Sequence, residues 1–219
     1  RGYDMVLPGP RGIFWRADAP ATVYWAEALD GGDYLKEMKY HDQVYTLEAP
    51  FRGEPAKFIA TEKRFGGITW GTPGFAILTE SLSKTRMRSV SSFNPSDPQN
   101  TLKKLWEINS DDSYNNPGRF ALTDNQWGRS VLLTGGKGKL LYLLGEGSSP
   151  EGDRPFIDSY ELATGKKTRL WRSEAPYYES VSSVIDIAKN KILTNRQSVS
   201  EVPNYFIRDL KSGKLAQVT

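Results

Sequence analysis

The sequence predicts an all-β protein made of about four β-propeller blades, each with four antiparallel strands. Four short pairs, each of which follows basic or polar residues, suggest a repeat: Phe58-Ile59, Leu105-Trp106, Leu170-Trp171 and Ala216-Gln217. The separation is 47 residues from Phe58 to Leu105 and again 47 residues from Leu170 to Gln217. The middle interval of 65 residues fits one repeat enlarged by a loop of about twenty residues. A period in the forties built from strands is typical of propeller blades.

Turn chemistry supports the same repeat. Residues 162–166 and 210–214 are matching segments that lie 48 residues apart, with a glycine in each, at Gly165 and Gly213. Such a glycine supplies the positive φ that tight hairpins need. We therefore expect both segments to join the third and fourth strands of a blade.

The repeat divides residues 1–219 into a partial propeller domain with approximate blades at 13–64, 65–110, 118–174 and 177–219. No stretch keeps helical spacing over three turns, since Gly31 and Gly32 interrupt the one candidate, residues 26–38. Residues 145–155 and 94–100 are rich in turn formers and are predicted to be surface loops.

Composition excludes several functional classes. The net charge of +3, from 29 basic and 26 acidic residues spread along the chain, does not form the clustered basic footprint of a nucleic-acid-binding protein. No apolar run is long enough to span a membrane. The absence of cysteine removes disulfides, thiolate zinc sites and cysteine nucleophiles. The first residue is Arg1 and no secretory leader follows it, so we expect a processed chain or a piece of a longer protein.

The known catalytic and metal motifs are also missing. Ser130 follows Gly128-Arg129, but the glycine that would complete a serine-hydrolase elbow is absent. His41, the single histidine, is predicted to be an exposed turn residue. The acidic run at Asp111-Asp112 lacks the glycine and distant glutamate of a helical calcium loop, and residues 135–139 predict a hairpin. We therefore expect no catalytic residue, metal or cofactor, although a pair of carboxylates as in glycosidases stays open among the 26 acidic residues.

Basic residues lie beside aromatic residues in two segments, and a third segment is rich in cations: Trp15-Arg16, residues 169–172 and residues 84–88. The alternation of Lys84, Arg86 and Arg88 predicts three cations on one face of a strand. One interpretation is a solvated strand face or a protected sheet edge. The other is a channel or interface that attracts an acidic ligand.

Several segments resemble a known family. These are residues 15–33, 64–70, Glu80 with 84–86, 147–158, and 164–167 with Trp171. They are similar, in the same order, to the β-propeller of glutamyl endopeptidases in the prolyl oligopeptidase family. The resemblance extends from about residue 12 to residue 219.

The resemblance implies a parent serine peptidase with an N-terminal propeller and a C-terminal α/β-hydrolase domain that holds a Ser-Asp-His triad. This chain ends at Thr219, before any such segment, so we expect it to be inactive alone. The propeller would restrict peptide access to the hydrolase domain. Arg16, Lys84 and Arg86 lie in family-like segments and are candidate contacts for a glutamate side chain of the substrate. Since bacterial relatives are often exported, the resemblance also suggests a periplasmic or otherwise exported protein.

A further expectation depends on the blade count. Such propellers usually have seven or eight blades, so four would form an open arc with exposed edges, and we expect self-association through them. The alternative function is a stand-alone propeller-like binding or scaffold module without an enzymatic parent.

Overall fold

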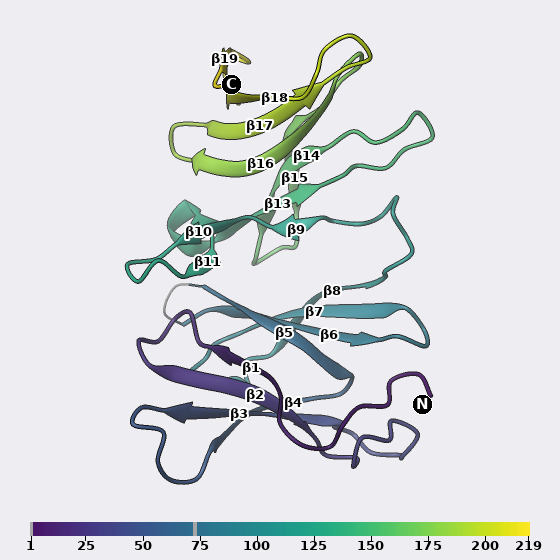
Figure 1. Cartoon of the computed structure of the whole chain (residues 1–219), viewed down its shortest axis with the longest axis vertical. Helices are drawn as coiled ribbons and strands as arrows, with labels where there is room; N and C mark the ends of the chain where they lie inside the picture. Colours follow the sequence, from purple (N-terminus) through teal and green to yellow (C-terminus); the bar gives the residue numbers. More distant parts are fainter. Residues whose placement is uncertain (1, 72–73) are drawn as a thin grey trace. The chain divides into compact units, whose positions relative to one another are not determined.

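The computed structural model describes residues 2–71 and 74–219. Over these residues, regular structure is all β-strand apart from one short 3-10 turn, η1 (Gly136–Gly138). The strands form antiparallel sheets from consecutive segments of the chain, which confirms the predicted all-β fold of four-stranded propeller blades (Figure 1). Two compact units are present: unit 1 is Arg1–Asp111 with Asn125–Val131, and unit 2 is Asp112–Asp124 with Leu132–Thr219.

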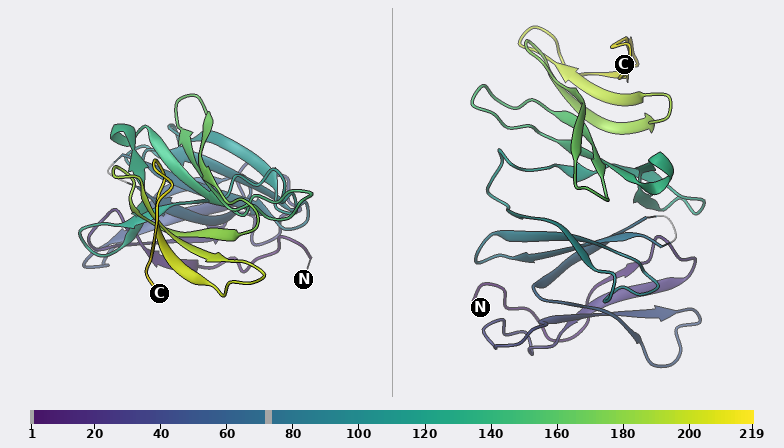
Figure 2. Two further views of the ribbon diagram at one scale, coloured as in Figure 1. Left: turned by 90° about the horizontal axis from the view of Figure 1, so that it is seen from above. Right: turned by 180° about the vertical axis from the view of Figure 1, so that it is seen from behind.

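Unit 1 contains two four-stranded sheets, each a meander in which neighbours in sequence are neighbours in space. The two sheets lie face to face in the front and rear ribbon views (Figures 1 and 2). The first sheet comprises β1 (Arg11–Trp15), β2 (Thr22–Ala28), β3 (Asp42–Glu48) and β4 (Ala56–Thr61). The second comprises β5 (Arg64–Trp70), β6 (Ala76–Leu82), β7 (Met87–Phe93) and β8 (Lys103–Asn109).

One hydrophobic core joins these two sheets. Side chains alternate between the faces of a strand, so Tyr24 and Ala26 of β2 both point toward the second sheet and are buried. Trp70 of β5 meets the Tyr24 ring edge-on, with ring centroids 5.3 Å apart. Burial of a large apolar side chain contributes roughly 1.5–3 kcal/mol, so this core holds the two sheets together as one unit.

Unit 2 contains the third and fourth sheets. In the third, β13 pairs on one edge with two short strands, β9 and β12, and on the other with β14. Residues 130–132 do not belong to this sheet, because β11 pairs with β10 in a separate two-stranded ribbon. The first strand of the blade is thus interrupted by an inserted ribbon. The strands of the third sheet are β9 (Arg119–Phe120), β12 (Thr134–Gly135), β13 (Leu140–Gly145), β14 (Phe156–Glu161) and β15 (Lys167–Arg172), and those of the separate ribbon are β10 (Leu122–Asp124) and β11 (Ser130–Leu132).

The fourth sheet packs on the third through a second core, in which Ile157 and Trp171 meet Val181 and Ile192. Its strands are β16 (Tyr178–Asp186), β17 (Lys191–Gln197), β18 (Asn204–Asp209) and β19 (Leu215–Gln217).

Both predicted hairpins are confirmed. Gly165 lies between β14 and β15 and Gly213 between β18 and β19, with φ of 73° and 71°. Each glycine N–H donates to the carbonyl four residues earlier, at 2.8 Å for Gly165 and 2.9 Å for Gly213. Two segments 48 residues apart therefore form the same turn, as the repeat requires.

The first strand of the first sheet, β1, has no clear signal in the sequence. Gly12 has a φ of 63°, and the pairing of β1 with β2 is irregular between Arg11 and Phe14. A short, bulged strand breaks the period-two pattern by which strands are recognised.

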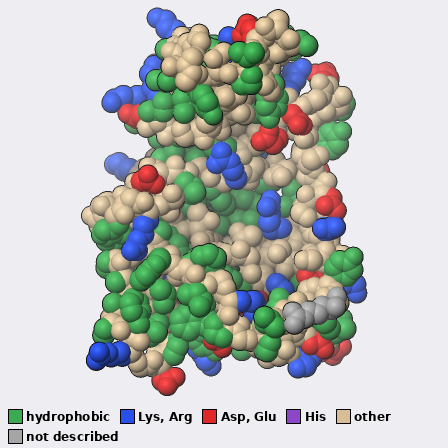
Figure 3. All heavy atoms as spheres, viewed as in Figure 1, with side chains coloured by type: hydrophobic (Ala, Val, Ile, Leu, Met, Phe, Trp, Pro, Cys, Tyr) green, Lys and Arg blue, Asp and Glu red, His purple; other side chains and the backbone are tan. Residues whose placement is uncertain are grey.

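The exposed edge strand β1 gives the first testable prediction. Ile13, Phe14 and Trp15 are 63, 54 and 54% exposed, and hydrophobic side chains gather over the first sheet in the space-filling view (Figure 3). Since β1 has a neighbour on one side only within the described sheet, we expect the 219-residue chain to self-associate. Light scattering across a concentration series should show dimers or larger species, and fewer of them for Ile13→Thr. A strictly monomeric wild-type chain at high concentration would contradict the prediction.

Candidate functional site

Arg16, the first of the predicted substrate contacts, lies in the turn between β1 and β2. Its guanidinium donates two hydrogen bonds to Asp18, from Nε at 3.0 Å and from Nη2 at 2.8 Å. It also lies over the rings of Trp70 and Phe58, with its central carbon 4.5 and 5.1 Å from their centroids. The side chain is thus fixed at the margin of the unit 1 core.

A second arginine, which sequence reasoning did not single out, holds the Arg16 turn in place. Arg129 donates from Nη1 to the carbonyls of Arg16 at 2.7 Å and Ala19 at 2.5 Å, and from Nη2 to that of Pro20 at 2.8 Å. One guanidinium with five N–H donors therefore satisfies three backbone carbonyls of a single turn.

Lys84 and Arg86 do not lie on a strand, so the expected row of three cations on one strand face is wrong. Both residues belong to the turn of residues 83–86 between β6 and β7, and only Arg88 lies in β7. Arg86 has a φ of 59°, a left-handed conformation that ends the strand alternation. Its side chain is exposed and lies 3.8 Å from the Asp111 carboxylate.

The three predicted cations fall at opposite ends of the second sheet. Arg16 contacts Trp70, which pairs with Ala76 at the start of β6. Lys84 and Arg86 follow Leu82, at the other end of that strand. Six residues of β-strand span about 20 Å, so one substrate carboxylate cannot contact Arg16 and the 83–86 turn together.

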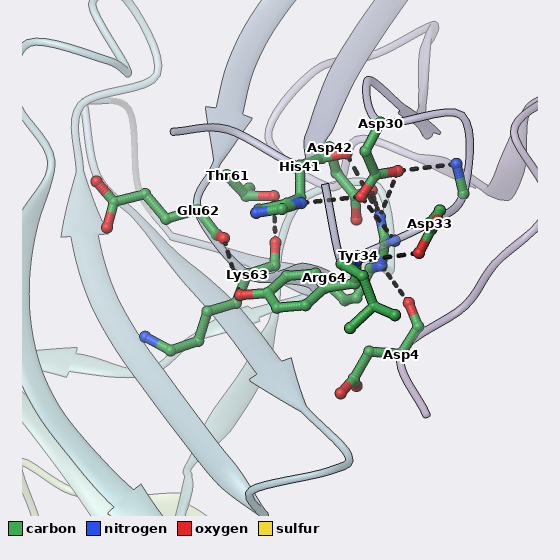
Figure 4. A network of polar contacts seen from close by, with 12 residues as sticks. Asp4, Asp30, Asp33, Tyr34, His41, Asp42, Thr61, Glu62, Lys63 and Arg64 are labelled. Carbon is green, nitrogen blue, oxygen red and sulfur yellow. Dashed lines mark hydrogen bonds and ion pairs between the residues drawn. The ribbon is translucent and has the colours of Figure 1, made fainter. Parts of the chain in front are cut away.

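Unit 1 also contains a buried polar network, shown in Figure 4. Arg64, at the start of β5, lies between two carboxylates whose side chains are fully buried: its Nη2 is 2.8 Å from Asp30 and its Nη1 is 2.9 Å from Asp42. Asp42 also pairs with Arg11 and accepts the Phe65 N–H at 2.7 Å. The network therefore connects the first sheet to the first strand of the second.

His41 belongs to this network, so the prediction that it is an exposed turn residue is wrong. It is 6% exposed, its Nδ1 lies 2.9 Å from Asp30 Oδ2, and its ring stacks on Tyr34 with centroids 4.0 Å apart. A histidine paired with a carboxylate is also part of a serine-hydrolase triad. Here the adjacent Thr61 hydroxyl donates to the Lys63 carbonyl at 2.7 Å, and the contacts of His41 are those of a structural residue.

The electrostatics of Asp30 agree with a structural role. Burial acts to raise the pKa of this carboxyl, but hydrogen bonds from His41 and Arg64 outweigh it and hold the pKa below its usual range. Asp30 is therefore ionised at neutral pH and is stabilised by its neighbours.

Unit 2 contains a cavity of about 750 Å³ between its two sheets. Trp171 of β15 and Tyr177, in the connection to β16, form aromatic walls, and four arginines contribute to the lining. We call this site the arginine cavity. On the face shown in Figure 3, by contrast, basic side chains are dispersed and form no continuous patch.

The fourth sheet supplies the polar side of the arginine cavity. Glu179 of β16 accepts two hydrogen bonds from Arg208 of β18, at 2.8 and 2.6 Å, and a third from the Thr194 hydroxyl at 2.6 Å. Arg196 of β17 donates to Glu201 at 3.1 Å and lies over the Tyr177 ring at 4.1 Å.

Sequence reasoning found only part of this cavity. The sequence shows residues 169–172 as a basic and aromatic segment, and one interpretation of it is a surface that attracts an acidic ligand. Glu179, Arg196 and Arg208 were missed, because they come together only through the pairing of β16, β17 and β18. The sequence shows that an arginine lies in a strand, but it does not show which side chains of the neighbouring strands that arginine contacts.

The described residues contain no group of three or more histidine, aspartate or glutamate side chains arranged to hold a metal ion. In the run at 111–116, Asp112 instead accepts hydrogen bonds from the Asn115 N–H at 3.1 Å and the Asn115 amide at 2.8 Å. In the part of the chain that the structure describes, no helix is long and apolar enough to cross a membrane.

Comparisons with known proteins identify two plant relatives, while no family model matches the chain. The probable chloroplastic glutamyl endopeptidases of Oryza sativa subsp. japonica and Arabidopsis thaliana are 32 and 33% identical to it. Each alignment covers 99% of this chain but 24% of the relative, so the chain spans about a quarter of their length. This similarity confirms the resemblance found in the sequence.

Solved structures share the fold, and two of them illustrate this. An uncharacterized protein from Listeria monocytogenes has a TM-score of 0.54 at 10% identity, over 100% of this chain and 57% of that protein. A candidate dipeptidyl aminopeptidase IV from Bacteroides ovatus has a TM-score of 0.52 at 12% identity, over 94% of this chain and 32% of that protein. Similarity at this level concerns the fold alone.

Proposed function

Because this chain is related to the glutamyl endopeptidases over nearly its whole length, we propose that it is the propeller portion of a serine peptidase. In this proposal the blades admit peptides and unfolded segments to an α/β-hydrolase domain of the same protein and exclude folded proteins. The observation that carries the proposal is 32–33% identity over 99% of the chain together with four-stranded blades.

The chemistry of the blades supports a non-catalytic role within such an enzyme. An acyl-transfer site needs a nucleophile with a base within hydrogen-bond reach. His41 is the single histidine of the sequence, and it is stacked on Tyr34 and paired with Asp30. A histidine base would therefore come from outside these 219 residues.

The packing of the blades supports a rigid barrier. Each unit has its own buried core shared between two sheets, and closely packed interiors deform little. In the proposal, a wall of such sheets would not deform to admit a folded domain.

The proposal is tested with the complete protein that carries these residues. We expect it to cleave a short peptide after glutamate, and to cleave the same sequence slowly or not at all inside a stably folded domain. Unfolding that domain, for example by removal of a stabilising core residue, should restore cleavage. Equal rates on folded and unfolded forms would contradict gating, and a complete absence of peptidase activity would favour the stand-alone binding module.

Lys84 and Arg86 stay within this proposal as candidate contacts for an acidic substrate side chain, since both are exposed in one turn. Replacing Arg86 by Glu is expected to reduce the preference for glutamate over glutamine, measured as the ratio of kcat/KM values, about fivefold. This magnitude corresponds to about 1 kcal/mol for an exposed charge pair. Arg52→Glu, at another exposed arginine of unit 1, is the matched control and should leave the ratio unchanged. An unaltered ratio in Arg86→Glu would remove Arg86 from the proposal.

A further inference from the structure

We propose that the arginine cavity of unit 2 binds a peptide segment through the carboxylate of an acidic side chain. The site lies between the third and fourth sheets of unit 2. Its occupancy is a matter of binding alone, so the proposal does not depend on the peptidase activity proposed above.

The register of the fourth sheet places the polar groups of the cavity on one face. Glu179 is paired with Arg196 across β16 and β17, and Arg208 is paired with Ile192 across β17 and β18. Cross-strand partners share a face, and Ile192 and Arg196 share one because they lie four residues apart on a strand. Since Ile192 packs in the core against the third sheet, all three polar side chains point toward that sheet.

Two of the arginines are held in position before any ligand arrives. Glu179 fixes Arg208 with two parallel hydrogen bonds, and Trp171 covers its guanidinium at 4.8 Å. Arg196 lies over both Tyr177 and Phe206, at 4.1 and 4.5 Å from the ring centroids. An arginine fixed by a carboxylate and a ring loses little freedom on binding a second acceptor.

These arginines keep donors that the protein does not use. Arg208 uses Nε and Nη2 for Glu179 and Arg196 uses Nη2 for Glu201, while the buried Nε of Arg196 has no hydrogen-bond partner. Arg172, also in the lining, has no ion pair or side-chain hydrogen bond among the described residues. A buried guanidinium donor without an acceptor is unfavourable, and a carboxylate is its strongest natural partner.

The aromatic walls indicate a peptide and not a free inorganic anion. Trp171 and Tyr177 offer apolar contact next to the arginine donors, and ligand sites for organic molecules combine apolar walls with a few placed polar groups. A glutamate side chain in a peptide has both parts, methylene groups for the rings and a carboxylate for the guanidinium groups.

The test is calorimetric titration of the complete protein with a short capped peptide containing one glutamate, N-methylated at the following bond so that it is not cleaved. We expect the glutamine analogue to bind at least tenfold more weakly. Arg196→Gln and Arg172→Gln should each weaken binding of the glutamate peptide at least fivefold. Arg119→Gln, at an exposed arginine of unit 2 outside the cavity, should bind it like the wild type.

Equal affinity for the two peptides, or unchanged affinity in both cavity variants, would overturn the proposal. If inorganic phosphate displaces the peptide and binds with the same affinity, the peptide is overturned as the ligand and the cavity is a site for free anions. Thermal unfolding establishes that each variant is folded. If Arg196→Gln does not fold, the affinity of Arg172→Gln decides the test, because the Arg172 side chain has no ion pair to lose. A protein that binds the peptide but cleaves no peptide would retain this site and lose the peptidase function.

Discussion

Replacing Arg64 by Met is expected to lower the free energy of unfolding by about 3–5 kcal/mol, the range for breaking a buried ion pair from one side. Arg64 lies 2.8 Å from Asp30 and 2.9 Å from Asp42, and both carboxylates are fully buried. Methionine fills much of the same volume but leaves two negative charges in a site that water does not reach. His41 and Arg11 each retain one of them, so the network is weakened and not abolished.

The pH dependence follows from Asp30, whose pKa is lowered in the folded state: burial acts to raise it, but His41 and Arg64 outweigh burial. A carboxyl with a lowered folded pKa contributes stability that is fully present above its unfolded pKa of about 3.9 and is lost as the pH falls through the folded value. The difference in the free energy of unfolding between wild type and Arg64→Met should therefore be largest at pH 7 and become smaller below about pH 4.

Urea denaturation at pH 7 and at pH 3.5 measures both effects. Arg52→Met, at an exposed arginine of the same unit, should change stability by less than about 0.5 kcal/mol. Adding Asp30→Asn to Arg64→Met removes one of the two buried carboxylates and should recover part of the loss. If the double variant is the less stable of the two, the excess buried negative charge is not the cause.

The sequence predicted the features that repeat along the chain, but it did not predict most contacts between residues that are far apart in the chain. The hairpins at Gly165 and Gly213 were predicted because a positive-φ turn between two strands is a local property of a few residues. Strand β1 was missed because a bulge near Gly12 breaks its alternation. The interrupted first strand of the third sheet was missed because residues 119–120 and 134–135 meet only on β13.

The same division holds for the sites. Residues 169–172 are contiguous, so their charge and aromatic content were visible in the sequence. His41 and Asp30 are 11 residues apart, and Arg208 and Glu179 are 29 apart. In the sequence, a polar residue that will be buried cannot be told from one that will be exposed. The difference is the hydrogen-bond or charge partner that the buried residue finds in the folded structure.

Replacing Glu179 by Gln is expected to lower the free energy of unfolding by about 2–4 kcal/mol, since Arg208 loses the carboxylate that neutralises it. The Glu179 and Arg208 side chains are 4 and 13% exposed, so water replaces the lost partner poorly. The amide oxygen still accepts the Thr194 hydroxyl, which leaves the charge as the main change. Glu174→Gln, on the exposed rim of the same cavity, is the control and should change stability by less than about 0.5 kcal/mol.

A double variant separates the value of this ion pair from the penalty for breaking it. Replacing both Glu179 and Arg208 by Met removes the two charges together, and buried pairs replaced by apolar residues are often close to neutral in stability. We therefore expect the double variant to be more stable than Glu179→Gln when both are unfolded in a scanning calorimeter. A double variant as unstable as the single one would mean that the pair itself stabilises the fold. If the stability of the double variant approaches that of the wild type, the charged pair is not needed for stability. Ligand binding in the arginine cavity, as proposed above, is then the role left for the Arg208 guanidinium that Glu179 holds.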